Sequence, residues 1–224
     1  MLSLSKHGVM QPLEIFVDYD ATITDRDTFD VLVQHEAGAK KWGEFEAHLH
    51  GRAMTLREVL AAEASLITCT LDEADAFLAR ETRFDPAFAV FVALCKMNET
   101  PVCILSSGIA PLIERALRRN GIDGVPVRAN GVDARPQGWV MHFRDASDNG
   151  HDKAADVREA QARGAAAVYI GDGYSDFEAA AAADVRFAKE GRALGPHLRE
   201  RGLPFIEFSS FRQVAGYFGL RSPI

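Results

Sequence analysis

The stretch 13–22, LEIFVDYDAT, places two carboxylates, Asp18 and Asp20, directly after a run of apolar residues. The apolar run predicts a buried strand, and charged groups are costly to hold at the end of one. Residues i and i+2 of a regular strand project to the same side, so the two charges would repel each other unless a cation lies between them or the chain already turns. The stretch therefore indicates a metal-dependent site at the end of a strand.

Six short apolar segments are predicted to be strands, because each is bounded by Gly, Pro, Asn or Asp. They are 13–18, 102–106, 125–129, 167–171, 185–188 and 205–208. Helical patterns lie between most of them, at 86–98, 110–120, 153–163 and 174–183. Strands that alternate with helices predict a parallel sheet covered on both faces, which is an α/β fold. The segment 131–143 departs from the alternation and is predicted to form a short β-hairpin.

A second departure is the region 26–82, which contains no convincing strand. Two capping boxes, beginning at Thr55 and Thr70, predict the start of two helices, and apolar stripes at helical spacing indicate others. We therefore expect a domain of about four helices at 26–82. It would be inserted into a core domain made of residues 1–25 and 83–224.

Composition limits the class of protein and its partners. The chain has 224 residues, 47% of them hydrophobic, which is enough for a substantial core. Its formal charge of −7 argues against nucleic acid or an anionic membrane surface as the main partner. No run approaches the roughly 18 apolar residues of a membrane span, and the segment 1–10 lacks the apolar part of a signal peptide. We expect a cytoplasmic protein, monomeric or homodimeric.

Further polar motifs fall at the same predicted edge of the sheet. Ser106-Ser107-Gly108 ends one strand and opens a helix, so a hydroxyl and free backbone N–H groups are placed to hold an anion. A loop with Asp172 and Asp176 follows the strand 167–171, and Lys153 opens the helix before that strand. Four carboxylates, a serine and a lysine are expected to converge at the topological switch point of the sheet.

With these motifs in this order, the chain resembles the haloacid dehalogenase superfamily, in particular its phosphoserine-phosphatase-like branch with a helical cap. The resemblance covers nearly the whole core, and the helical insert lies between the first and second motifs, as in that branch. Each motif alone is weak evidence, whereas their order and spacing are specific. The resemblance implies a Rossmann-like core and a phosphatase that uses Mg²⁺ and an aspartyl-phosphate to hydrolyse a small phosphorylated metabolite.

The resemblance also implies a role for each motif residue. Asp18 would be the nucleophile, and Asp20 would be the general acid and then the general base. Mg²⁺ would be held by Asp18, the backbone carbonyl of Asp20 and Asp172, with Asp176 as an outer ligand or hydrogen-bonding support. The substrate phosphate would be bound by residues of the second and third motifs: Ser106, Ser107, Gly108 and Lys153.

Three positions depart from the pattern of the family, and one of them is Ser175, which replaces an asparagine common before the last acid. Ser107 stands where many relatives have the first of two glycines, which leaves open whether Ser106 or Ser107 binds the phosphoryl group. Ser106 is favoured, because Ser107-Gly108 then takes the place of Gly-Gly. Ala21 stands where many relatives have glycine, and a loop that tolerates a methyl group could accept it.

The insert is expected to select the substrate, because in this architecture it closes over the leaving group. Phosphoserine phosphatases read the amino and carboxylate groups of serine with a cap acid and a cap arginine. Asp27 stands near the position of the acid, whereas Arg52 and Arg57 do not align convincingly with the arginine. The helix around them offers apolar residues instead, which predicts a more apolar pocket.

Two segments, 16–24 and 183–189, look like those of the methionine-salvage enol-phosphate phosphatases. An enol phosphate of that type is therefore the expected substrate, and phosphoserine phosphatase is the alternative enzyme. The alternative from another class is a non-catalytic module of the same fold that binds phosphate or metal. Because none of the four motifs is missing, the enzyme is favoured over the module.

Overall fold

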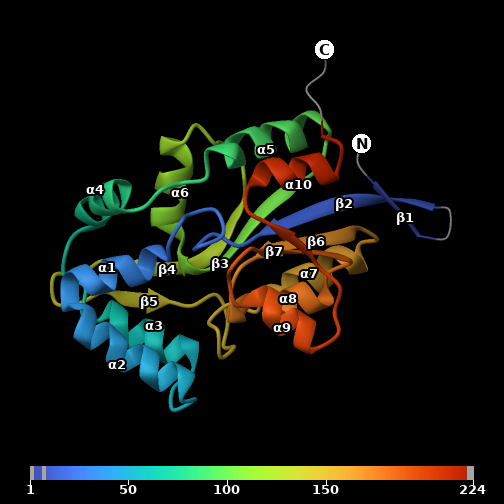
Figure 1. Cartoon of the computed structure of the whole chain (residues 1–224). Helices are drawn as coiled ribbons and strands as arrows, with labels where there is room; N and C mark the ends of the chain where they lie inside the picture. Colours follow the sequence, from blue (N-terminus) through green and yellow to red (C-terminus); the bar gives the residue numbers. More distant parts are fainter. Residues whose placement is uncertain (1–2, 7–8, 221–224) are drawn as a thin grey trace.

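A mostly parallel sheet organises the computed structural model, which describes residues 3–6 and 9–220 (Figure 1). Its strands are β1 (Ser3–Lys6), β2 (Val9–Val17), β3 (Val102–Ile109), β4 (Val127–Asp133), β5 (Val140–His142), β6 (Ala166–Gly171), β7 (Val185–Lys189) and β8 (Ile206–Phe208). Their order is β5-β4-β3-β2-β6-β7-β8, and β1 pairs with β2. Only the β1–β2 and β4–β5 pairs are antiparallel among the described strands. The predicted α/β class is confirmed, including the hairpin formed by β4 and β5.

The strand order places a topological switch at β2. The chain leaves β2 for β3 on one side, and later returns to pair β6 with the other side of β2. Ligands of open α/β sheets bind at the carboxyl ends of the strands beside such a switch. The segments that directly follow β2, β3 and β6 are therefore the ones positioned for chemistry.

Two layers of helices cover the sheet (Figure 1). One face packs against α5 (Pro86–Met97), α6 (Ala110–Arg119) and α10 (Phe211–Tyr217), and the other against α7 (Lys153–Ala162), α8 (Phe177–Ala182) and α9 (Leu194–Glu200). Side chains of β2 alternate between the layers, since Ile15 and Val17 lie in one hydrophobic cluster and Phe16 in the other. Because both faces of β2 are buried, its sequence near the carboxyl end is a nearly continuous apolar run.

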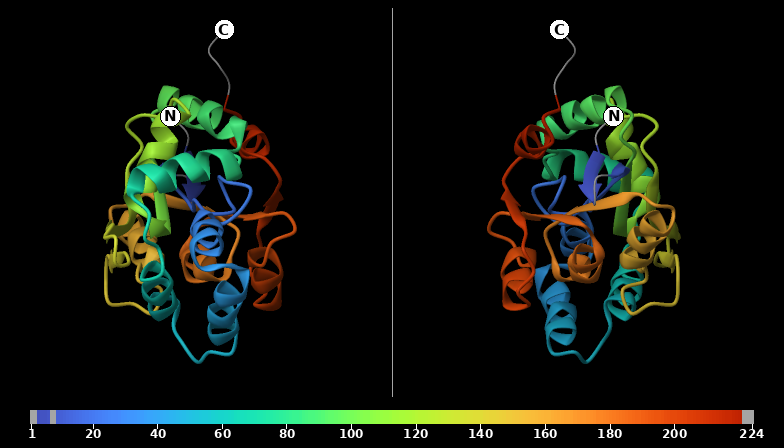
Figure 2. Two further views of the ribbon diagram at one scale, coloured as in Figure 1. Left: turned by 90° about the vertical axis from the view of Figure 1, so that its left-hand side faces the viewer. Right: turned by 90° about the vertical axis from the view of Figure 1, so that its right-hand side faces the viewer.

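Four helices form the insert between β2 and α5. They are α1 (Thr28–Ala37), α2 (Ala39–His50), α3 (Leu56–Ala64) and α4 (Leu71–Glu81). Both predicted capping boxes are confirmed. The hydroxyls of Thr55 and Thr70 accept hydrogen bonds from the backbone N–H groups of Glu58 and Glu73, and the side chains of these glutamates accept from the backbone N–H groups of the two threonines. Figure 2 shows α2 and α3 forming the lower end of the molecule, away from α5 and α10.

The hairpin contributes to the core of the insert. Trp139 and Met141 are buried in the same hydrophobic cluster as Leu32 of α1 and Leu60 of α3. The indole N–H of Trp139 also donates to the backbone oxygen of Cys69, at 2.7 Å. The insert is therefore tied to the sheet by β5 as well as by its own two chain connections.

Some elements were not expected from the sequence. The short helices α9 and α10 and the strand β1 are additional, and the helix expected at 174–183 is divided into a 3₁₀ turn, Tyr174–Asp176, and α8. No helix in the described part of the chain is both long enough and apolar enough to cross a membrane. Parts of the predicted core domain lie outside the described residues, namely 1–2, 7–8 and 221–224. The first two of these ranges also belong to the segment 1–10.

Candidate active site

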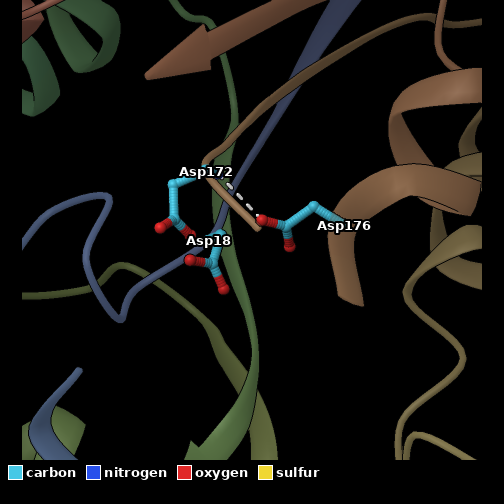
Figure 3. Close-up of side chains that lie close together, drawn as sticks. All are labelled: Asp18, Asp172 and Asp176. Carbon is cyan, nitrogen blue, oxygen red and sulfur yellow. Dashed lines mark hydrogen bonds between the residues drawn. The ribbon is translucent and has the colours of Figure 1, made fainter. Parts of the chain in front are cut away.

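Three acidic side chains meet at the carboxyl edge of the sheet (Figure 3). Asp18 directly follows β2 and Asp172 directly follows β6, while Asp176 ends the 3₁₀ turn of the same loop. One carboxylate oxygen from each lies within 4.8 Å of the others. The backbone N–H of Asp18 donates to the oxygen of Ile170 at 2.8 Å, which fixes the two strand ends side by side. The convergence expected from the strand pattern is therefore present for these three residues.

Lys153 pairs with two of these carboxylates. Its Nζ donates to Asp18 Oδ1 and to Asp176 Oδ1, each at 2.7 Å, and its side chain is 2% exposed. The residue begins α7, whose N-cap Asp152 accepts from the backbone N–H of Ala155. A buried ammonium group needs such partners, because an unpaired charge is costly away from water. Lys153 therefore holds one oxygen of Asp18 in a fixed position.

Asp176 is fully buried and organises the loop after β6. Its Oδ2 accepts from the backbone N–H groups of Asp172 and Gly173, at 2.9 and 3.0 Å, and the hydroxyl of Tyr169 donates to its Oδ1 at 2.6 Å. Burial opposes ionisation, but Lys153 and these donors hold the pKa of Asp176 below its usual value. Asp176 therefore supports the loop through these hydrogen bonds, and its partners favour the ionised form.

Among the residues that the structure describes, no cation pairs with the carboxylate of Asp172 in this way. Burial first, and then the charges of Asp18 and Asp176, raise its pKa to about 9, although Lys153 and Arg192 oppose the rise. Burial and Asp176 likewise raise the pKa of Asp18. Three carboxylates thus face one ammonium group, an arrangement that a divalent cation would stabilise. Because all three donors are oxygens, the set fits Mg²⁺.

The side chain of Asp20 points toward the insert rather than into this carboxylate cluster. Its Oδ1 accepts from the backbone N–H of Thr28 at 2.8 Å and from the Thr28 hydroxyl at 2.6 Å. Burial first, and then the charge of Asp27, raise the pKa of Asp20 to about 7, and the Thr28 bonds oppose the rise. A carboxyl group that titrates near neutrality is suited to proton transfer. Thr28 was not identified from the sequence.

The loop that follows Asp20 adopts a tight turn. Ala21 has φ +54°, in the left-handed region that favours glycine. Its backbone N–H donates to the hydroxyl of Thr24 at 3.0 Å, and that hydroxyl donates to the oxygen of Arg26 at 2.7 Å. These bonds maintain the turn although Ala21 carries a methyl group.

Both serines of the second motif border the same cavity. Ser106 Oγ accepts from the backbone N–H of Gly108 at 2.9 Å and lies 3.5 Å from Asp20 Oδ2. Ser107 Oγ is buried without a hydrogen-bond partner in the described part of the chain, and its backbone oxygen accepts from Asn130 at 2.7 Å. The Ser106 hydroxyl therefore has two partners, Asp20 and Gly108, whereas the Ser107 hydroxyl has none in the described part of the chain.

Gly108 leaves no room for a side chain, which gives a first testable prediction. A Cβ at this position would lie 2.7 Å from Asp20 Oδ2 and 3.1 Å from Ser106 Oγ. Because Thr28 holds the other oxygen of Asp20, Gly108→Ala is expected to misplace the Asp20 carboxyl group and reduce kcat by about 10–100-fold. The control is Gly216→Ala in α10, where a Cβ meets no other atom within 4 Å. An unchanged kcat for Gly108→Ala would show that Asp20 tolerates the displacement.

A cavity of about 880 Å³ lies between the carboxylate cluster and the insert. Asp27 and Arg52 line it, whereas Arg57 does not. The guanidinium group of Arg57 donates to the backbone oxygen of Asp145 and lies 4.6 Å from the ring centre of Phe143. Of the three candidate specificity residues, Arg57 therefore has a structural contact instead of a place in the cavity.

The lining of the cavity also differs from the apolar pocket expected from the sequence. Apolar side chains are present, among them Phe29, Trp42 and Leu60. The insert also contributes carboxylates that were not identified from the sequence: Asp30, Glu46 and Glu63. Asp27 itself caps α1 by accepting from two backbone N–H groups, and burial raises its pKa to about 7. The part of the cavity bordered by the insert is therefore acidic as well as apolar.

Comparison with known proteins adds independent information. Residues 15–181 match the family of haloacid dehalogenase-like hydrolases. The chain is 29% identical to the polyol phosphate phosphatase PYP1 of Saccharomyces cerevisiae, over 89% of this chain and 90% of that protein. It is 27% identical to a 2-hydroxy-3-keto-5-methylthiopentenyl-1-phosphate phosphatase of Microcystis aeruginosa, over 92% and 98% of the two chains. A substrate-bound phosphoserine phosphatase has the same fold, with a TM-score of 0.73 and 16% identity over 92% of this chain and 98% of that one.

Proposed function

Because the chain belongs to the haloacid dehalogenase-like hydrolases and is a phosphatase like its named relatives, we propose that it hydrolyses a small phosphomonoester through an aspartyl-phosphate on Asp18. The observation that carries this proposal is the meeting of Asp18, Asp172 and Asp176 with Lys153 at the carboxyl edge of the sheet. The insert, residues 26–82, would act as a cap over the leaving group.

In the first step, Asp18 attacks phosphorus. Lys153 binds Asp18 Oδ1, which leaves Oδ2 to form the new bond to phosphorus as the ester bond to the leaving oxygen breaks. The leaving oxygen takes a proton from Asp20, whose Oδ1 is held by Thr28. The products of this step are the free alcohol and the phosphorylated Asp18.

In the second step, the phosphoryl group is transferred to water. The oxygen of the water attacks phosphorus while the Asp20 carboxylate removes a proton from that water. The bond between phosphorus and Asp18 breaks in the same step. Inorganic phosphate leaves, and both aspartates return to their starting forms. A pKa of about 7 lets Asp20 release the proton in the first step and take one up in the second.

Mg²⁺ fits the donor set of this site. Asp18, Asp172 and the backbone carbonyl of Asp20 would hold it, with Asp176 supporting the loop from outside. Bound there, the ion would neutralise charge on the phosphoryl oxygens and attract the anionic substrate. Ser106 or Ser107, together with the N–H of Gly108 and with Lys153, would bind the remaining phosphoryl oxygens.

Two substrate classes have support among the relatives. One is an enol phosphate of the methionine-salvage type, as the name of the Microcystis aeruginosa protein indicates. The other is a polyol phosphate, as the name of the Saccharomyces cerevisiae protein indicates. Phosphoserine has support from the shared fold alone.

The proposal is tested by measuring phosphate release from p-nitrophenyl phosphate and from both substrate classes, with Mg²⁺ and after chelation. We expect turnover only with Mg²⁺, and radiolabelled phosphate bound covalently to Asp18 after acid quenching during turnover. Full activity after exhaustive chelation would exclude the metal. Phosphate binding without turnover on any ester would support the non-catalytic module instead.

A further inference from the structure

Glu63 is a buried acid that no part of the proposed chemistry uses. It lies in α3, it is one of the residues that line the cavity that contains Asp18, and it is 1% exposed. Its Oε1 has no hydrogen-bond partner among the described residues. Leaving a polar group buried and unpaired costs stability, so the position requires an explanation other than folding.

The surroundings of Glu63 add to this cost. Burial first, and then the charges of Glu46 and Asp27, raise the pKa of Glu63 to about 8. Asp30 borders the same cavity, and burial raises its pKa to about 7 despite the nearby Trp42 indole. These carboxyl groups come from three helices of the insert, so the acidic wall is a property of the folded insert and not of one segment.

Arginines and a lysine line the same cavity, but in the described part of the chain none of them pairs with this wall. Glu46 lies 3.5 Å from the imidazole of His50, but neither Asp30 nor Glu63 forms an ion pair within the described ranges. The arginines at the cavity border, such as Arg52, form no ion pair with them there either. A hydrogen-bond donor brought against this wall would satisfy Oε1 of Glu63 and favour ionisation of the Glu63 carboxyl group, whereas an anionic group would oppose that ionisation.

We infer that Glu63 selects the substrate by accepting a hydrogen bond from a donor on the leaving alcohol, either a hydroxyl group of a polyol phosphate or the ammonium group of an aminoalkyl phosphate. This inference rests on the proposed phosphatase function and specifies the class of ester. A carboxylate on the alcohol, as in phosphoserine, has no donor to offer Oε1 and would oppose the ionisation of Glu63, Asp27 and Asp30. An alcohol with only an apolar chain would leave Glu63 unpaired.

The test compares wild type, Glu63→Leu and Glu63→Gln on three esters with Mg²⁺: glycerol 3-phosphate, phosphoethanolamine and propyl phosphate. For Glu63→Leu, we expect kcat/KM to fall about 10–100-fold on whichever donor-bearing ester is accepted, and to stay unchanged on propyl phosphate. Glu63→Gln retains an acceptor oxygen but no charge. It should preserve most activity on a hydroxyl donor and lose it on an ammonium donor, which separates the two sources.

The matched control is Glu44→Gln, which changes an exposed carboxylate of the insert outside the cavity and should leave all three rates unchanged. Equal losses on all three esters for Glu63→Leu, or no loss on any, would overturn the inference. The melting temperature of Glu63→Leu should equal or exceed that of wild type, because an unpaired buried polar group is removed, and that of Glu63→Gln should stay close to wild type, because an amide takes the place of the carboxyl group. A fall in both would assign Glu63 a structural role and also overturn the inference.

A binding measurement separates this inference from the proposed function. Glycerol 3-phosphate or phosphoethanolamine should raise the melting temperature of the wild-type protein more than that of Glu63→Leu, whereas propyl phosphate should raise both equally. This readout does not require turnover. Selective stabilisation without hydrolysis would retain Glu63 as the selecting residue and reject the phosphatase reaction, and equal stabilisation would reject the selection.

Discussion

Replacing Asp18 with asparagine is expected to lower phosphate release by about 10³-fold or more, to background, while the fold is retained. Asparagine has nearly the same size, but its amide lacks the charge that attacks phosphorus and helps to hold the metal. Lys153 would keep its second partner, Asp176, at 2.7 Å, so the buried ammonium group would remain paired. Turnover of p-nitrophenyl phosphate with Mg²⁺ measures the loss, and circular dichroism with thermal unfolding checks the fold.

Asp123→Asn provides the control, because Asp123 is an exposed aspartate outside the cavity and its variant should retain wild-type turnover. The outcome that would contradict the prediction is an Asp18→Asn enzyme with turnover close to that of wild type. Asp18 would then have no role as the nucleophile. Loss of activity together with loss of the thermal transition would instead assign Asp18 a structural role.

The parts of the site that follow strands could be predicted from the sequence. Asp18, Ser106 and Asp172 each come at or directly after an apolar run, and parallel strands bring their carboxyl ends to one edge. The role of Lys153 could not be predicted from its local sequence alone, because a lysine in the first turn of a helix is usually solvated. Its position between Asp18 and Asp176 depends on how α7 packs on the sheet.

The parts of the site that depend on packing between distant segments could not be predicted. Glu63 shares a face of α3 with Val59 and Leu60, three and four residues before it, but a glutamate is by residue type expected at the surface. Its burial depends on how the neighbouring helices pack. The sequence predicts that Trp139 packs within the hairpin. In the structure it packs into the insert, and its indole N–H donates to the backbone oxygen of Cys69, 70 positions away. The helices α9 and α10 have seven residues each, too few to show a clear period.

The contact between Thr28 and Asp20 was also not predicted from the sequence. It leads to the second prediction with a large expected effect, which concerns Asp20. Thr28 begins α1, so its backbone N–H has no partner within the helix and is free to donate to Asp20 Oδ1. In Asp20→Asn, the amide oxygen could still accept both bonds from Thr28, but the amide nitrogen could not supply or take the proton. Turnover should fall about 10²–10⁴-fold, the usual contribution of general acid–base catalysis.

The size of that loss should depend on the leaving group, which distinguishes proton transfer from a role in shaping the site. Propyl phosphate releases a strongly basic alkoxide that needs a proton, whereas p-nitrophenolate leaves almost without one. Asp20→Asn should therefore slow propyl phosphate hydrolysis much more than p-nitrophenyl phosphate hydrolysis. Thr28→Val is the matched variant, because it removes the 2.6 Å hydroxyl bond to Asp20 and keeps the backbone bond, so it should cause a smaller loss. Equal losses on the two esters for Asp20→Asn would mean that Asp20 positions the site without carrying a proton.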